Sequence, residues 1–121
     1  MKKRVKFGRV KNGKPSFAEI EMETVIAGKN IIEWDSRLVN YEHIYRESVK
    51  DGVSKALSAH LGKAHCSFRI TDFIESPTDT NEFIVSCVAT SAAWQALGNE
   101  ASQVSFKYDE KEEYWYVIIE S

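Results

Sequence analysis

The sequence predicts an α+β protein, a two-layer sandwich in which two helices cover one face of a mostly antiparallel sheet. Its strand-like and helix-like segments follow one another in the order strand, strand, strand, helix, strand, helix, strand, strand. Each of them has a single apolar face, and so both helices pack on the same side of the sheet. With 121 residues, the chain has the length of one domain, which we place at residues 1–121.

Composition narrows the class of protein. A hydrophobic fraction of 43% with 12% aromatic residues is typical of a folded globular domain. The net charge of −2 provides no overall field for binding a polyanion. The chain has two cysteines, no apolar run at its N-terminus and no apolar stretch near the ~18 residues of a membrane span. We therefore expect a cytoplasmic protein that does not enter a membrane and needs no cofactor.

The first two strands are predicted to form a hairpin. Apolar alternation begins around Val5, and the Asn-Gly pair at residues 12–13 is a strong signal for a tight turn. The strand over residues 16–26 has an apolar face, made by Ala18, Ile20, Met22 and Thr24, and an acidic face, made by Glu19, Glu21 and Glu23. Because Arg4 and Lys6 are placed opposite the glutamates, we expect charge pairs across the hairpin.

A turn at residues 27–30 leads to a third extended segment over residues 31–39. From Asn40 the apolar residues recur at spacings of three and four, which predicts an amphipathic helix capped by Asn40 and ended by Gly62. Gly52 lies inside this helix, where glycine costs about 1 kcal/mol relative to alanine. We therefore expect another element to approach the helix closely at Gly52.

The stretch "ESPTDTNEF", after the fourth strand, has two interpretations. In the first, a loop leads to a helix over residues 80–97, with Asp79 as its N-cap and Glu82 reaching back to the cap. In the second, residues 81–90 continue as a strand of a hairpin, because they alternate and are rich in β-forming residues. We favour the helix, since no turn signal separates this run from the alanine-rich segment that ends at Gly98.

The chain ends with two strand-like runs, at residues 103–109 and 113–120, which we expect to pair across a charged turn. Trp115 points to one face of the second strand, and its neighbours Tyr114 and Tyr116 point to the other. One of these faces joins the core. The other is predicted to be an exposed aromatic patch of the kind found at protein interfaces.

The segment of residues 39–97 resembles the fourth domain of elongation factor G, a module with the ribosomal protein S5 domain 2-like fold. The helix "VNYEHIYRESVKDGVSKAL" is similar to the family's "EYIPAVEKGI" helix at Tyr41, Val49, Gly52 and Val53. The strand "CSFRITD" follows, and then "TDTNEF" where the family has a "VDSSE" cap. The resemblance implies a left-handed βαβ crossover and a free-standing relative of that domain, associated with the ribosome or with RNA.

The chain also departs from the family. It has "GKPSFAEI" where the family has a Gly-rich "GQYGHV" entry to a strand, and Ser76 where the family's tip loop has a histidine. It contains no GxxxxGK[ST] sequence for binding phosphate, and so it is not a GTPase by itself.

Soft metal ligands gather at His60, His65 and Cys66. His65 and Cys66 point to opposite faces of the strand over residues 64–74, and so we expect no metal site. Cys66 lies on the apolar face of this strand, which argues against a reactive thiolate. The carboxylates of the loop after this strand are explained by their solvation and by helix capping. A minor hypothesis is that two of them act as the acid/base pair of an enzyme.

We expect a small non-enzymatic binding module that recognises a macromolecular partner, a protein or a second copy of the chain, through the open sheet face or the loop after residue 74. The residues expected to bind are Glu75, Ser76, Thr78, Asp79, Arg69 and Trp115. The alternative is a ribosome-associated or RNA-binding relative of the elongation factor domain. A basic strip on the open face favours RNA, although the glutamate row opposes it; the strip consists of Arg4, Lys6, His65, Arg69 and Lys107.

Overall fold

The computed structural model describes residues 1–26, 31–60 and 66–120. Over these residues, six strands and two α-helices follow one another in the predicted order, which confirms the two-layer α+β class. The elements are β1 (Lys2–Lys11), β2 (Lys14–Ile26), β3 (Ile32–Trp34), α1 (Val39–Ala59), β4 (Cys66–Ile74), α2 (Glu82–Ala96), β5 (Val104–Asp109) and β6 (Tyr114–Ile119). Two short 3-10 helices, Ser36–Leu38 and Ala101–Gln103, precede α1 and β5.

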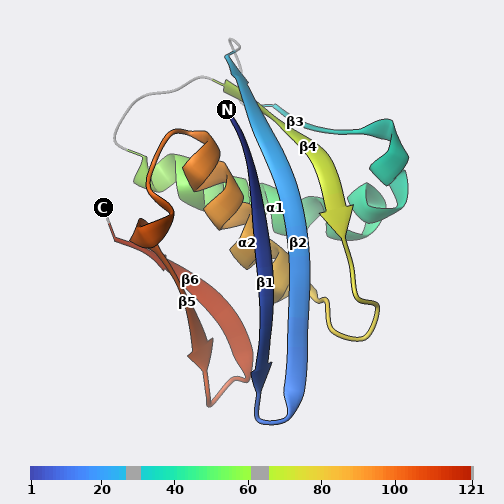
Figure 1. Cartoon of the computed structure of the whole chain (residues 1–121), viewed down its shortest axis with the longest axis vertical. Coiled ribbons are helices and arrows are strands. Elements are labelled where there is room, and N and C mark those ends of the chain that lie inside the picture. Colours follow the sequence, from blue (N-terminus) through green and yellow to red (C-terminus); the bar gives the residue numbers. More distant parts are fainter. Residues whose placement is uncertain (27–30, 61–65, 121) are drawn as a thin grey trace.

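Four strands form one sheet in the order β1-β2-β4-β3, and β5 and β6 form a separate two-stranded sheet. Neighbours in the larger sheet are antiparallel except β3 and β4, which run parallel and are separated in the sequence by α1. Figure 1 shows both helices behind the larger sheet, with the hairpin of β5 and β6 standing beside β1. No element among the described residues covers the front of the sheet (Figure 1), which we call the open face.

The hairpin of β1 and β2 is confirmed. Its turn consists of Asn12 and Gly13, which both have positive φ angles, 53° and 76°, as a two-residue turn of this kind requires. In β2 the predicted apolar residues Ala18, Ile20 and Met22 are fully buried, and the glutamates occupy the open face of the sheet. The expected pairing of Arg4 with the glutamates also forms.

A β-bulge breaks the alternation of β4. Met22 is paired with Ile70 and Glu21 with Asp72, which leaves Thr71 as the extra residue on β4. Beyond the bulge Phe73 is buried, although a strict alternation from Ile70 would point its side chain to the open face of the sheet. The bulge therefore brings two neighbouring side chains, Thr71 and Asp72, close to the charged residues of β1 and β2.

The prediction for residues 31–39 is wrong in part. Only Ile32–Trp34 are extended, because the Asp35 carboxylate accepts a hydrogen bond from the backbone N–H of Arg37 and turns the chain into a 3-10 helix. The following helix α1 begins at Val39, so Asn40 lies inside it and is not its cap. The predicted turn at residues 27–30 and the predicted stop at Gly62 lie outside the described residues.

Residues 82–96 form the helix α2, which excludes the alternative hairpin. The predicted cap at Asp79 is wrong: Asn81 is the N-cap, and its side chain accepts a hydrogen bond from the N–H of Ile84 over 3.0 Å. Gly98, with a φ of 98°, follows the end of the helix as predicted. The residues from Ile84 to Trp94 are all buried, because β1 and β2, α1 and β6 surround the helix.

The close approach at Gly52 is confirmed. A Cβ atom at this position would lie 2.7 Å from the Cβ of Ala89, 2.7 Å from the carbonyl oxygen of Ser86 and 2.8 Å from the backbone nitrogen of Thr90. The absence of a side chain at Gly52 is therefore what allows α1 and α2 to pack backbone to backbone.

The C-terminal strands pair as predicted, but they do not extend the larger sheet. Aromatic rings join the two sheets: the ring of Phe7 lies 5.1 Å from that of Phe106 and 4.9 Å from that of Trp115. Trp115 is only 8% exposed, and so most of its side chain belongs to the core. Tyr114 and Tyr116, on the other face of β6, are partly exposed.

Candidate functional site

The predicted binding loop after β4 is held in place by its own hydrogen bonds. The hydroxyl groups of Ser76 and Thr78 both donate to the carboxylate of Asp79, each over 3.1 Å. The Thr80 hydroxyl donates to the carbonyl of Phe17 over 2.6 Å, and the N–H of Phe17 donates to the carbonyl of Asp79 over 3.0 Å. Asp79 therefore organises this loop, which is tied to the start of β2.

The remaining predicted residues lie elsewhere. Glu75 accepts a hydrogen bond from the hydroxyl of Tyr45, a contact that ties the loop to α1. Arg69 lies on the open sheet face and contacts Asp35 at 3.6 Å. Six residues of extended chain, or roughly 20 Å, separate Arg69 from Glu75. The structure therefore does not unite the predicted residues in one site.

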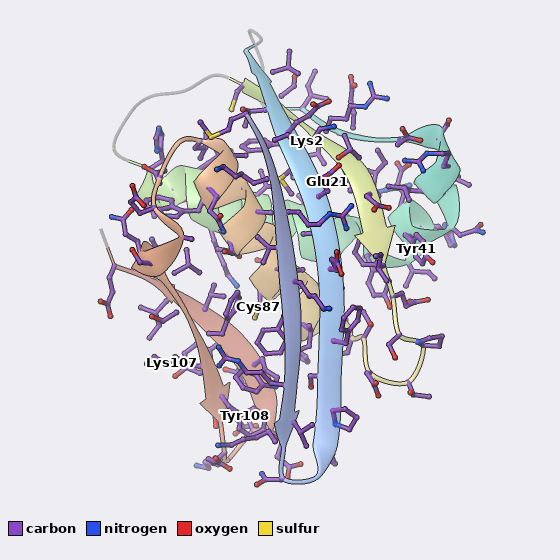
Figure 2. The ribbon with its side chains drawn as sticks, in the orientation of Figure 1. Lys2, Glu21, Tyr41, Cys87, Lys107 and Tyr108 are labelled. Carbon is purple, nitrogen blue, oxygen red and sulfur yellow. The ribbon has the colours of Figure 1, made fainter. Side chains whose placement is uncertain are left out.

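The open sheet face carries charges that neutralise one another. Arg4 makes ion pairs with Glu19 at 2.6 Å, with Glu21 at 3.3 Å and with Asp72. The Arg4 guanidinium lowers the pKa of Asp72, while the pKa of Glu21 is lowered mainly by the hydroxyl of Thr71. In Figure 2, Lys2 and Glu21 lie together on this face, and they approach within 3.8 Å.

The predicted basic strip does not form as one surface. Lys107 belongs to the separate hairpin of β5 and β6, as Figure 2 also shows, and His65 lies outside the described residues. Of the other members, Arg4 forms ion pairs with carboxylates, and Arg69 forms one with Asp35. Lys6 lies 6.0 Å from the centre of the Phe17 ring, and it is the member of the strip on this face that no ion pair among the described residues neutralises.

Three adjoining hollows follow β6 from its first residue to its last, and we name them together the β6 groove. The first, about 320 Å³, contacts Tyr114 and Trp115 and also the predicted residues Thr78 and Asp79. The second, about 340 Å³, shares Tyr114 and Trp115 with the first. The third, about 570 Å³, contacts Val117 and Ile119, and like the second it borders Asp51 and Lys55 on α1.

The middle hollow combines aromatic rings with carboxylates. Phe83 at the start of α2 lies 5.1 Å from the ring of Tyr114, which in turn lies 6.0 Å from that of Tyr116. The carboxylates of Glu47 and Glu82 border the same hollow, and within the described part of the chain neither takes part in an ion pair.

A hydrogen-bonded group lies on the floor of this hollow. The Ser86 hydroxyl donates to Asp51 over 2.6 Å, and Lys55 contacts the same carboxylate at 3.0 Å. The Ser86 hydroxyl, helped by Lys55, lowers the pKa of Asp51. A carboxylate with a lowered pKa is a weak base, which argues against its use in activating Ser86 as a nucleophile.

Cys87 borders the middle hollow but is only 2% exposed. Burial raises the pKa of its thiol to about 12, and so the reactive thiolate is scarce at neutral pH. Among the described residues no group of His, Cys, Asp and Glu side chains has the arrangement of a metal site. Nor does any helix within those residues have the length and hydrophobicity to cross a membrane.

Comparison with known proteins identifies a similar fold. The sequence matches no known protein family, and no curated protein matches it. Among solved structures 28 chains match, one of them ttk003000868 from Thermus thermophilus. The two superpose with a TM-score of 0.68 at 13% sequence identity, over 78% of this chain and 15% of that chain. This chain thus spans only 15% of that longer chain, and the likeness shows a shared fold.

Sequence reasoning missed the β6 groove because its two walls are far apart in the sequence. In the second and third hollows one wall is α1 and the other is β6, and each of these elements packs on α2. In the first hollow the wall opposite β6 is the start of β2 with the loop before α2. A signal was nevertheless present. The strand "YWYVII" contains no charged residue, glycine or proline, which is unusual for a strand with an unpaired edge.

Proposed function

We propose that this protein is a small non-enzymatic binding module that recognises a protein partner through the β6 groove. One observation carries the proposal: three hollows that share lining residues follow an uncharged strand, and the rings of Phe83, Tyr114 and Tyr116 border the middle one. Aromatic side chains are enriched where proteins meet, since they bury much surface for little loss of conformational freedom. The proposal places the site on β6 rather than on the open sheet face.

The charges around the groove favour a protein over a nucleic acid. Glu47 and Glu82 border the middle hollow, and their carboxylates repel phosphate groups. Lys55, the basic residue shared by the second and third hollows, is paired with Asp51. An enzyme is less well supported, since the Ser86 hydroxyl and the Cys87 thiol both lack an activating base.

Photo-crosslinking from inside the groove tests this proposal. A benzophenone amino acid replaces Ser58, which borders the third hollow, or Ile44, which is exposed on α1 outside the groove. We expect a discrete crosslinked protein from Ser58 and none from Ile44. The identified partner is then purified and titrated against variants of the module.

Two neighbouring residues of β6 provide the matched variants. Val117 faces the groove, whereas Ile118 is exposed on the opposite face of the strand. Val117→Asp is expected to weaken binding of the purified partner at least about tenfold, and Ile118→Asp is expected to change it little. Equal affinities of the two variants, or identical crosslinks from both positions, would reject the groove as the binding site.

A second candidate function, contact with RNA or the ribosome as in the fourth domain of elongation factor G, is favoured by one cluster. The Arg9 guanidinium lies 5.3 Å from the ring of Phe7, 5.5 Å from that of Trp115 and 5.9 Å from that of Phe106. Phe7 and Trp115 are buried, but Arg9 is exposed, so its guanidinium remains available to a phosphate group. Sedimentation with ribosomes at low salt that is lost in Arg9→Glu would support this candidate, and its absence would dismiss it.

A further inference from the structure

We propose that the partner contributes an extended segment, which adds as a third strand to the outer edge of β6 and places a lysine or arginine side chain in the middle hollow. The inference rests on the proposed function and specifies how the β6 groove is occupied. Strand addition of this kind derives affinity from backbone hydrogen bonds and specificity from pockets for alternate side chains.

The outer edge of β6 has unpaired backbone groups. The N–H of Glu120 donates to the carbonyl of Gln103 just beyond the paired strands. Hydrogen-bonded positions alternate in an antiparallel pair, so Ile118, Tyr116 and Tyr114 bond to β5. The N–H and C=O groups of the intervening residues point to the opposite edge, and these residues are Trp115, Val117 and Ile119. No backbone partner for them is found among the described residues outside β5.

The groove runs along this edge and not only over one face of the strand. The middle hollow contacts three consecutive residues, Tyr114, Trp115 and Tyr116, although consecutive side chains of a strand point to opposite faces. The third hollow contacts Val117 and Ile119, two of the residues whose backbone groups point outward. A chain lying in the groove would therefore meet the backbone of β6 directly.

The other strand edges are protected against pairing with another chain, whereas the edge of β6 is not. The edge strand β1 carries six basic residues, Lys2, Lys3, Arg4, Lys6, Arg9 and Lys11. At the other end of the larger sheet, β3 has only three residues, and β5 contains Lys107 and Asp109. Charged side chains and short length are the usual protection against pairing with another chain, and β6 has neither of them.

Charge and aromatic character specify the side chain that the middle hollow accepts. Phe83, Tyr114 and Tyr116 form its aromatic rim, and the electron-rich faces of such rings attract cations. The carboxylates of Glu47 and Glu82 add negative charge that no described ion pair neutralises. A lysine or arginine from the added strand would complement both features.

Peptides of alternating valine and threonine, seven residues long and labelled with fluorescein, test the inference by fluorescence polarisation. The central residue is Lys, Arg, Leu or Glu, and a further Lys peptide carries N-methyl groups on the residues whose N–H groups would face β6. We expect saturable binding of the Lys and Arg peptides to the full chain. Binding of the Glu peptide and of the N-methylated peptide is expected to be at least tenfold weaker.

Two variants of one residue separate backbone pairing from side-chain packing. Val117→Pro removes an N–H that points outward and leaves the ladder with β5 intact, since edge strands tolerate proline on their unpaired side. Val117→Thr keeps the N–H and the shape of the side chain. We expect Val117→Pro to lose at least tenfold in affinity and Val117→Thr to retain binding, with circular dichroism as the check on folding. If Val117→Pro does not fold, the N-methylated peptide provides the same comparison.

The outcomes distinguish the inference from the proposed function. A crosslinked partner that is lost in Val117→Asp but binds Val117→Pro and Val117→Thr equally would keep the groove and overturn strand addition. Failure of every peptide to bind at millimolar concentration would also overturn it. Sedimentation equilibrium that finds a dimer disrupted by Val117→Pro would assign the edge to a second copy of the chain and overturn the proposed partner segment.

Discussion

Replacement of Gly52 by alanine tests the backbone contact between α1 and α2. The added methyl group would lie 2.7 Å from the carbonyl oxygen of Ser86 and 2.8 Å from the nitrogen of Thr90, both of which are backbone atoms of α2. The third neighbour, 2.7 Å away, is the Cβ of Ala89, which no side-chain rotation moves. The two helices must therefore separate, or one of them must distort, to accept the methyl group.

Two opposing effects set the size of the change. Alanine at a helix interior position is favoured over glycine by about 1 kcal/mol. Overpacking of a core costs roughly 1–3 kcal/mol, and we take the upper end because the contacted atoms cannot rotate away. The free energy of unfolding of Gly52→Ala is therefore expected to fall by about 2 kcal/mol, which lowers the urea midpoint by about 1 M for a typical slope of about 2 kcal/mol per M.

Urea denaturation followed by circular dichroism measures this change. The matched control is Ser54→Ala on the exposed side of α1, which we expect to raise stability by a few tenths of a kcal/mol through helix propensity alone. If Gly52→Ala were as stable as the native protein, or more stable, α1 and α2 would have room for a side chain and our account of their packing would be refuted.

Two further predictions concern the α2 cap and the charged sheet face. Asn81→Ala should lower the free energy of unfolding by about 1 kcal/mol, because the N–H of Ile84 loses its acceptor. Asp79→Ala should lower the free energy of unfolding by less than Asn81→Ala does, and it should raise the hydrogen-exchange rates of the loop amides. If Asp79→Ala were the more destabilising of the two, Asp79 would be the cap of α2. Arg4→Gln should lower stability at pH 7 by about 0.5–1 kcal/mol, as for other exposed ion pairs. It should also change how stability depends on pH between pH 7 and pH 4. In the native protein the lowered pKa of Asp72 provides stability that is present above its ordinary value of 3.8 and is lost as the pH falls through the lower folded value. Without Arg4, the adjacent carboxylates repel one another at pH 7, and the stability of the variant should rise as the pH falls from 7 to 4. Over the same range the contribution of Asp72 to the native protein is retained. Thermal unfolding would contradict us if the variant showed the same pH dependence as the native protein.

Local patterns predicted the elements of this fold because each has a physical signal within a few residues. The Asn-Gly turn at residues 12–13 and the alternation of Ala18, Ile20 and Met22 are of this kind. Gly52 was also informative, since a glycine that weakens a helix needs a compensating contact. The helical cap was misplaced by two residues because Asp79 and Asn81 are equally good caps, and only the tie between the loop and Phe17 decides between them.

The candidate site was not predictable in the same way. Trp115 was expected to contact a partner, but the face of β6 that joins the core depends on how the hairpin meets Phe7, far away in the sequence. The β6 groove likewise depends on the distance between α1 and β6, which α2 sets. A stronger signal was the near absence of charge in α2, since a helix that is apolar all round must be enclosed by several elements.

The contact of Phe7 with Trp115 has a consequence for how the chain folds. The two residues lie at opposite ends of the sequence, so this contact closes a loop that contains nearly every other residue. Such non-local contacts slow folding, because the entropy of closing the loop is lost before the contact forms. We therefore expect α2 to stay partly uncovered until late in folding, with its buried alanines and valines accessible to chaperones while β5 and β6 are still being synthesised.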